Sequence, residues 1–184
     1  MSDPTVVDPV GPRAAELLGC LIDLLDHYGA GVCRAFVHPG TTAPWDACGS
    51  TTDGAEGQAW VAVPRIYPVA PFPTEDAGAQ RCHPVEYAAN ITAGVLRCAA
   101  TVDDEGRAPA PADVSTDAAK VTRDAAIILE ALLCCYLDDD ADPGTFRLGD
   151  WTPLGPDGGC VGGQWTATIR IPACPCPDLS GLGE

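Results

Sequence analysis

The stretch DVSTDAAKVTRDAAIILEALLCCYL, residues 113–137, carries the strongest periodic pattern in the chain. Apolar residues recur in it at steps of three and four, which predicts one long amphipathic helix with a single buried face. The predicted stripe consists of Val114, Ala118, Val121, Ala125, Ile128, Leu132 and Tyr136. The polar residues that we expect mainly off this stripe are Asp117, Lys120, Asp124 and Glu130. Pro143 and Gly144 stop any continuation of the helix.

The segments on either side of this helix predict a shorter helix and several strands. The expected order is a helix over 12–28, strands over 32–38, 58–67 and 86–99, the long helix, and two closing strands between 146 and 171. Pro64 lies inside the second of these strands. Because proline cannot donate a ladder hydrogen bond, that strand lies at an edge of the sheet or carries a bulge.

This order predicts an α+β fold, with one mainly antiparallel sheet of about five strands and two helices packed on one face. Residues 1–172 are expected to form a single domain with long loops at 39–56 and 68–85. Residues 173–184 are rich in Cys and Pro and are expected to form an extended C-terminal tail. The glycine-dense turn over 153–163 lies between two strands and lacks the Lys and Ser or Thr of a phosphate loop, so we interpret it as a wide hairpin turn.

Charge excludes some classes of partner. The chain of 184 residues holds 26 Asp and Glu against 10 Lys and Arg, for a net charge of −16. Such a surface disfavours gripping nucleic acid or an anionic membrane, because both need clustered cations. The longest apolar run, 125–137, is too short to span a bilayer, and the N-terminus lacks a basic region before an apolar stretch. We expect a protein made and folded in the cytoplasm.

The ten cysteines point to no definite chemistry. Without a signal peptide, a disulfide framework is not expected, and several cysteines fall within apolar patterns typical of small core residues. The candidates for zinc ligands are Cys160, Cys174 and Cys176, but the paired C-x₂₋₄-C knuckles of structural zinc sites are absent. The acidic run 138–142 fails the calcium-loop pattern, since Pro143 and Gly149 occupy the positions that need Gly and Glu. We predict no metal and no cofactor.

No catalytic set emerges either. A cysteine nucleophile needs a histidine base, and the three histidines are His27 on a helix and His38 and His83, each before a proline. We therefore expect a protein without enzymatic activity. The surfaces expected to meet other subunits or partners carry Trp151, Asp157, Gly158, Gly159, Glu75, Asp76 and Arg81. Trp60 and Trp165 lie within strand patterns and are expected in the core.

The closing stretch GDWTPLGPDGGCVGGQWTATIRIP, residues 149–172, resembles the ends of head–tail connector and tail-terminator proteins of long-tailed phages that infect actinobacteria. In the tail-terminator family, a helix, three strands, a second helix and two strands build each subunit. That order covers about residues 12–172 here, whereas the Cys-rich tail after 172 belongs to no pattern of the family.

The resemblance implies a structural virion protein at the head–tail junction, assembled in the bacterial host cytoplasm. Six copies would form a homohexameric ring that caps the tail tube and joins it to the head-completion or stopper proteins. DNA would pass through the lumen without specific binding, which an acidic chain favours. The alternatives are a stopper or head-completion protein, a small metalloprotein ligated by Cys160, Cys174 and Cys176, and an acidic adaptor that binds a basic partner through 138–142.

Overall fold

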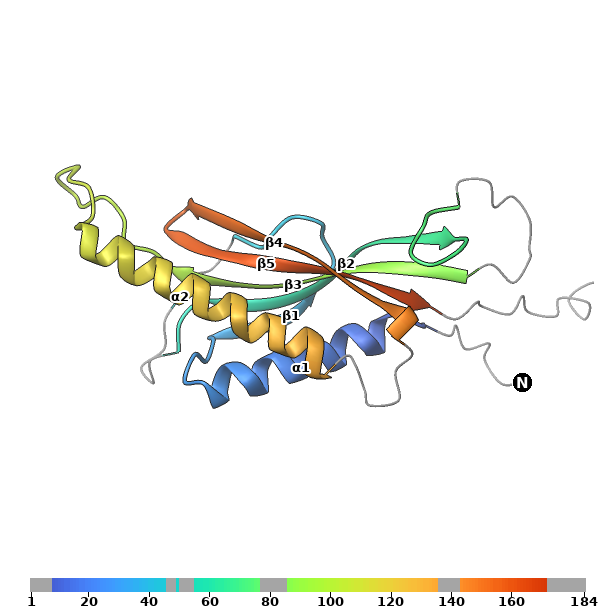
Figure 1. The fold of residues 1–184 in the computed structure, drawn as a ribbon. Coiled ribbons are helices and arrows are strands. Elements are labelled where there is room, and N and C mark those ends of the chain that lie inside the picture. The colour runs from blue at the N-terminus through green and yellow to red at the C-terminus, as the bar shows by residue number, and fades with distance from the viewer. Residues whose placement is uncertain (1–7, 46–48, 50–54, 77–85, 136–142, 172–184) are drawn as a thin grey trace, which may run out of the picture.

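The structure, a computed structural model, describes residues 8–45, 49, 55–76, 86–135 and 143–171 (Figure 1). The elements are α1 (Gly11–His27), β1 (Arg34–His38), β2 (Gln58–Val69), β3 (Glu86–Cys98), α2 (Pro111–Glu130), β4 (Phe146–Asp157) and β5 (Cys160–Ile171). A π-helical turn, Ala131–Cys135, extends α2, and a 3₁₀ turn, Pro143–Thr145, precedes β4. The expected order of elements is confirmed.

One five-stranded sheet holds the molecule together, in the order β1-β2-β3-β5-β4. Strand β1 runs parallel to β2, whereas the other three pairings are antiparallel. Both helices cover the same face of the sheet (Figure 1). The predicted α+β fold with a mainly antiparallel sheet is therefore confirmed, with one parallel pair at the β1 edge.

The main core lies between that face and the helices. Alternate residues of β3, from Ala89 to Val95, belong to this core together with Leu17, Leu21 and Leu25 on the buried side of α1. These side chains are at most 1% exposed, and each of the three leucines contributes about 1.5–3 kcal/mol by leaving water. The N-terminus of α1 is fixed by Asp8, whose carboxylate accepts hydrogen bonds from the backbone N–H groups of Val10 and Gly11 at 2.9 and 2.8 Å.

A second, smaller core lies on the opposite face. Trp60 is 1% exposed and packs there with Ala62 and Leu96. Its ring occupies the space beside Gly94, where a Cβ would lie 2.3 Å from the ring. The expectation that Trp60 is a core residue is thus confirmed, whereas Trp165 is half-buried against the main core.

The closing hairpin is tighter than the sequence predicts. The turn between β4 and β5 comprises only Gly158 and Gly159, with φ of 56° and 76°. Left-handed φ at both positions belongs to a two-residue type I′ turn, which glycine adopts at no steric cost. The predicted wide turn over 153–163 is wrong because its glycines continue the strands. For example, the Trp151 ring lies beside Gly163 of β5, where a Cβ would be only 2.2 Å from the ring.

Two other boundaries differ from expectation. Strand β2 is an interior strand, so Pro64 does not mark an edge of the sheet. The pairing of β2 with β3 shifts register between Ala62 and Arg65, so Pro64 lies at a bulge, which is the other of the two predicted possibilities. The same strand continues to Val69, which forms a bridge with Glu75, so the loop expected over 68–85 begins later than predicted. Residues 77–85 lie outside the described residues.

A buried ion pair fixes α2 to the rest of the fold. Arg97 and Asp124 are both 1% exposed, and the guanidinium donates to the two carboxylate oxygens at 2.7 and 2.9 Å. Its remaining N–H groups donate to the backbone carbonyls of Ala30, Gly31 and Glu56. The prediction that Asp124 lies off the buried side of the helix is wrong, because this arginine satisfies its charge inside the protein.

A disulfide joins Cys20 of α1 to Cys135 in the turn after α2, with Cα atoms 6.3 Å apart. Cys160 is also disulfide-bonded, whereas Cys33, Cys98 and Cys134 form no disulfide. The expectation of unpaired cysteines is therefore wrong for Cys20, Cys135 and Cys160. Among the described helices, none has the length and apolar character needed to cross a membrane.

Candidate functional site

The apolar stripe of α2 is buried along only half of its length. Ile128 and Leu132 are at most 1% exposed, and every residue that α2 and its π turn give to the core lies at or after Ile127. Val114, in the first turns of the same stripe, is 53% exposed. The prediction of one continuous buried face is wrong for the N-terminal half, where Val114 and Ala118 are exposed and Val121 and Ala125 are only half-buried.

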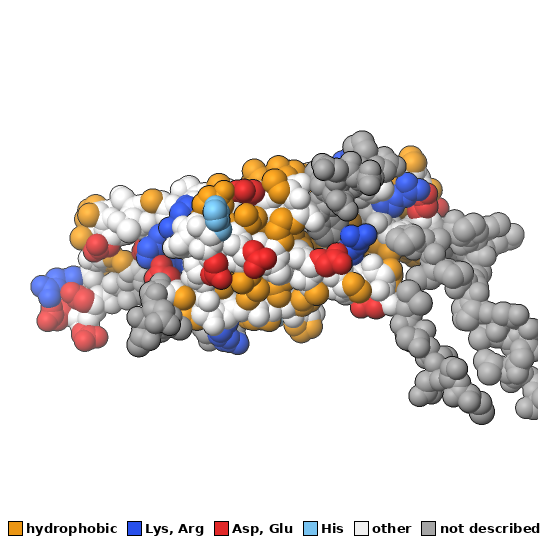
Figure 2. Space-filling model, turned by 90° about the horizontal axis from the view of Figure 1, so that it is seen from below, with side chains coloured by type: hydrophobic (Ala, Val, Ile, Leu, Met, Phe, Trp, Pro, Cys, Tyr) orange, Lys and Arg blue, Asp and Glu red, His pale blue; other side chains and the backbone are white. Residues whose placement is uncertain are grey.

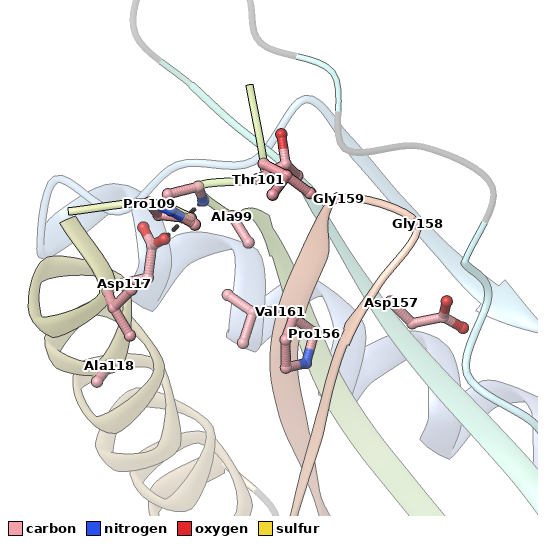
Figure 3. Close-up of a pocket in the computed structure, with 13 residues that line it drawn as sticks. Ala99, Thr101, Pro109, Asp117, Ala118, Pro156, Asp157, Gly158, Gly159 and Val161 are labelled. Carbon is pink, nitrogen blue, oxygen red and sulfur yellow. Dashed lines mark hydrogen bonds between the residues drawn. The ribbon is translucent and has the colours of Figure 1, made fainter. Parts of the chain in front are cut away.

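Beside this exposed half lies a groove of about 550 Å³ (Figure 3). Three segments form its walls: the first turns of α2, the connection from β3 to α2, and the tip of the β4–β5 hairpin. The lining residues are Ala99, Ala100, Thr101, Val102, Pro109, Val114, Asp117, Ala118, Pro156, Asp157, Gly158, Gly159 and Val161. The groove therefore joins segments that are far apart in the sequence.

Backbone hydrogen bonds hold the three walls together. The N–H of Ala100 donates to the Asp117 carboxylate at 2.8 Å, which ties the connection to α2. The N–H of Ala99 donates to the carbonyl of Gly159 at 2.8 Å, which ties the same connection to the hairpin tip. Figure 3 shows Asp117 turned toward the connection and the Asp157 side chain pointing away from α2. Most of the remaining lining consists of apolar atoms, among them those of Val161.

Local sequence explains the shape of the connection. The Asp103 carboxylate accepts hydrogen bonds from the N–H groups of Glu105 and Arg107 at 3.0 and 2.9 Å, and Gly106 takes a φ of 78° within this turn. Pro111 then begins α2, where its missing N–H costs no helical hydrogen bond. The chain is thereby turned back over the end of the sheet, so that α2 runs along the sheet from the groove.

The groove is suited to holding an apolar surface. Its described lining carries no imidazole, thiol or amine. Of its two aspartates, Asp117 accepts a hydrogen bond from the backbone N–H of Ala100, and the Asp157 side chain points away from α2 (Figure 3). Valine, alanine and proline side chains instead present carbon atoms, with Val102 61% exposed. Covering such side chains with a complementary apolar surface displaces water and lowers the free energy. The groove is therefore a candidate contact surface.

The structure does not bring the predicted interface residues together: some line the groove, others lie at the opposite end of the sheet, and Trp151 lies between them. Asp157, Gly158 and Gly159 line the groove. Glu75 and Asp76 lie at the opposite end of the sheet, where Glu75 pairs with Arg65 at 2.5 Å. Arg81 is outside the described residues.

Trp151 lies between these ends and is half-buried. Its ring packs on Trp165 with centroids 5.9 Å apart, and the Trp165 Nε1–H donates to the carbonyl of Ala125 at 2.8 Å. Sequence reasoning missed Val102 and the exposure of Val114. The periodicity placed Val114 in the apolar stripe of α2, but it did not indicate that this side chain is exposed.

The metal and nucleophile candidates are not brought together within the described part of the chain. No group of three or more His, Cys, Asp or Glu side chains there is placed to hold a metal ion. The Cys160 sulfur is in a disulfide and so is not a thiolate ligand, while Cys174, Cys176 and the acidic run 138–142 lie outside the described residues.

Cys33 and Cys98 form no disulfide, and each has its own local contacts. Cys33 donates to the carbonyls of Gly49 and Ala55 at 3.1 and 3.0 Å. Burial, followed by the nearby Glu56 and Cys33, raises the pKa of the Cys98 thiol. A raised pKa reduces the thiolate fraction, which is the opposite of what a cysteine nucleophile needs.

Comparison with known proteins gives no family for the chain. No protein-family model matches it, and no curated protein sequence matches it. Function must therefore be argued from the fold, the groove and the distribution of charge.

Proposed function

We propose that the protein is a structural, non-enzymatic virion protein, a tail terminator that forms a ring at the head–tail junction of a long-tailed phage. The observation that carries the proposal is the architecture: α1, three strands, α2 and two strands build one sheet with both helices on one face. This is the element order that the resemblance of residues 149–172 implies for a tail-terminator subunit.

The distribution of charge supports a ring through which DNA passes. The chain carries a net charge of −16. Figure 2 shows acidic side chains spread among apolar ones on the face seen from below, with the few basic side chains scattered between them. Such a surface repels phosphate, so DNA in a lumen would slide without specific binding. The ring, proposed as a homohexamer, would bind the tail tube protein on one side and the stopper or head-completion protein on the other.

The long second helix favours a terminator over a stopper. Stoppers tend to be smaller and rich in β-barrel structure, whereas α2 runs from Pro111 to Glu130 and continues in a π turn to Cys135. A small metalloprotein is less well supported, because the Cys160 sulfur is in a disulfide.

Native mass spectrometry of the purified protein tests the ring. We expect a metal-free species at six times the 19.0 kDa chain mass, formed alone or after addition of the tail tube protein. Electron microscopy of the same sample should show rings, and an antibody to the protein should label the head–tail junction of particles. A zinc-loaded monomer, or particles without label, would overturn the proposal.

A further inference from the structure

We infer that the groove at the start of α2 receives the opposite end of the sheet from a second copy of this chain. That end, called here the β2–β3 end, comprises residues 65–69 of β2 and 86–88 of β3. The inference rests on the proposed self-assembly and names the two surfaces that would carry it. It is independent of which virion component the assembled protein forms.

The two surfaces lie too far apart to meet within one molecule. Strand β3 begins at Glu86 in the β2–β3 end and finishes at Cys98, directly before the groove residue Ala99. At about 3.3 Å per residue, a strand of 13 residues separates them by roughly 40 Å. Figure 1 shows the β4–β5 turn and the start of α2 at one end of the molecule and the β2–β3 end at the other. Contact between them therefore requires another copy.

Each surface exposes large apolar side chains that the core of its own subunit does not use. In the β2–β3 end, Ile66 is 55% and Tyr87 is 36% exposed. Ile66 pairs with Ala89, and Tyr87 is two residues before Ala89 on β3, so both point to the same face of the sheet. At the groove, Val102 and Val114 are 61% and 53% exposed. Among the described residues, four of the eight large apolar side chains that are exposed thus lie on these two surfaces.

The two surfaces differ in their balance of charge. Around the groove lie six acidic residues, Asp103, Asp104, Glu105, Asp113, Asp117 and Asp157, and two basic ones that pair with three of them, Arg107 with Asp103 and Glu105, and Lys120 with Asp117. Acidic residues therefore remain in excess there. The β2–β3 end and its neighbouring strands instead gather arginines, since the sheet register aligns Arg65, Asn90, Thr168 and Arg147 across four strands. Arg65 and Arg170 each pair with one carboxylate, yet remain 52% and 36% exposed. In a chain with a net charge of −16, an end whose carboxylates are matched by arginines can approach the acidic groove with little repulsion.

Two different surfaces at opposite ends of one subunit make a heterologous, head-to-tail contact. Such a contact generates a closed ring when the rotation between neighbours divides a full turn, and an open filament otherwise. The inferred contact therefore supplies what a ring requires, because every copy carries one β2–β3 end and one groove.

Complementary single-surface variants test the contact. Val114→Asp places a charge in the groove and leaves the β2–β3 end intact, while Ile66→Asp does the reverse. Val37→Asp is the matched control, because Val37 is 44% exposed on β1 and lies outside both surfaces. All three changes are at exposed positions, so circular dichroism and thermal melting should match the wild type.

We expect analytical ultracentrifugation to show oligomers for the wild type and for Val37→Asp, and monomers for the other two variants alone. Mixing Val114→Asp with Ile66→Asp should restore one contact and give a heterodimer of twice the 19.0 kDa chain mass. A photo-crosslinking residue at position 114 of the wild type should couple to residues 65–69 of a neighbour.

Several results would overturn the contact: a wild type that stays monomeric at every concentration, a Val114→Asp variant that keeps the wild-type oligomer, a mixture that stays monomeric, or a crosslink to residues 173–184 or to a bound small molecule. Failure of the proposed function is distinguishable from these results. Rings that survive Val114→Asp would remove the contact and keep the terminator, whereas variant-sensitive oligomers missing from virions would do the opposite.

Discussion

The two halves of α2 share one apolar stripe but differ in what covers it. The C-terminal half packs on the sheet and α1 through Ile127 and Ile128 and is fixed by the Arg97–Asp124 pair. The N-terminal half passes along the end of the sheet, with Val114 exposed beside the groove. Amphipathic periodicity therefore shows that a helix has an apolar face, but it does not say whether that face meets the same chain or another one.

The largest effect should come from breaking the ion pair of the buried half. Arg97→Met leaves Asp124 as a buried carboxylate without its partner, and three backbone carbonyls lose their donor. We expect a loss of about 3–5 kcal/mol in the free energy of unfolding, measured by urea denaturation.

The control is the double variant Arg97→Met with Asp124→Leu. It should recover part of the loss because no unpaired charge remains, but not all of it, because the three carbonyls still lack the guanidinium donor. A cost below about 1 kcal/mol for the single variant would show that the pair does not hold α2 in place.

A matched truncation sharpens the comparison between the halves. Ile128→Ala removes atoms from a fully buried position, so unfolding should become easier by about 2–5 kcal/mol. Val114→Ala removes exposed atoms, and we expect a change within about 0.5 kcal/mol for the monomer. Urea denaturation of both variants at low protein concentration measures the difference. Equal losses would mean that the N-terminal half is covered within the monomer.

The smallest effect concerns the contact where α1 ends beside α2. The Tyr28 hydroxyl donates to the Glu130 carboxylate at 2.9 Å, and this hydrogen bond to a charged acceptor raises the pKa of Tyr28. A raised folded-state pKa stabilises the protein below the ordinary value of 10.0, and this contribution is lost as the pH rises through the folded-state value.

Tyr28→Phe should therefore lower the melting temperature slightly at pH 8 and make no difference at strongly alkaline pH. Thermal melts across this range measure the gap between variant and wild type. A gap that is constant with pH would rule out the hydrogen bond as its source.

Much of the fold was predictable from local pattern, and the failures have physical causes. Periodicity located both helices, and Phe146 and Ile171 correctly bounded the closing hairpin. It misjudged the turn between them because Pro153, Gly162 and Gly163 carry no alternating side-chain signal while their backbones still pair. It placed Asp124 on the outside because a carboxylate is expected in solvent unless a buried partner is known. That partner, Arg97, lies 27 residues away on another element.

The candidate site was predictable in one part only. Asp157, Gly158 and Gly159 were expected at a contact surface and do line the groove, but their role there stays a prediction. The walls that face them come from the β3–α2 connection and α2, and sequence spacing does not show that these segments meet the hairpin tip. The disulfide of Cys20 with Cys135 was missed for the same reason, since 115 positions separate the two residues.

The sequence by itself determined the order of helices and strands, the acidic surface and which residues are apolar, because these follow from local periodicity and composition. Only the tertiary structure decided which apolar residues are covered, which charge is buried and which distant segments form the groove. Burial depends on what packs against a side chain, and in this fold those partners come from elements far away along the chain.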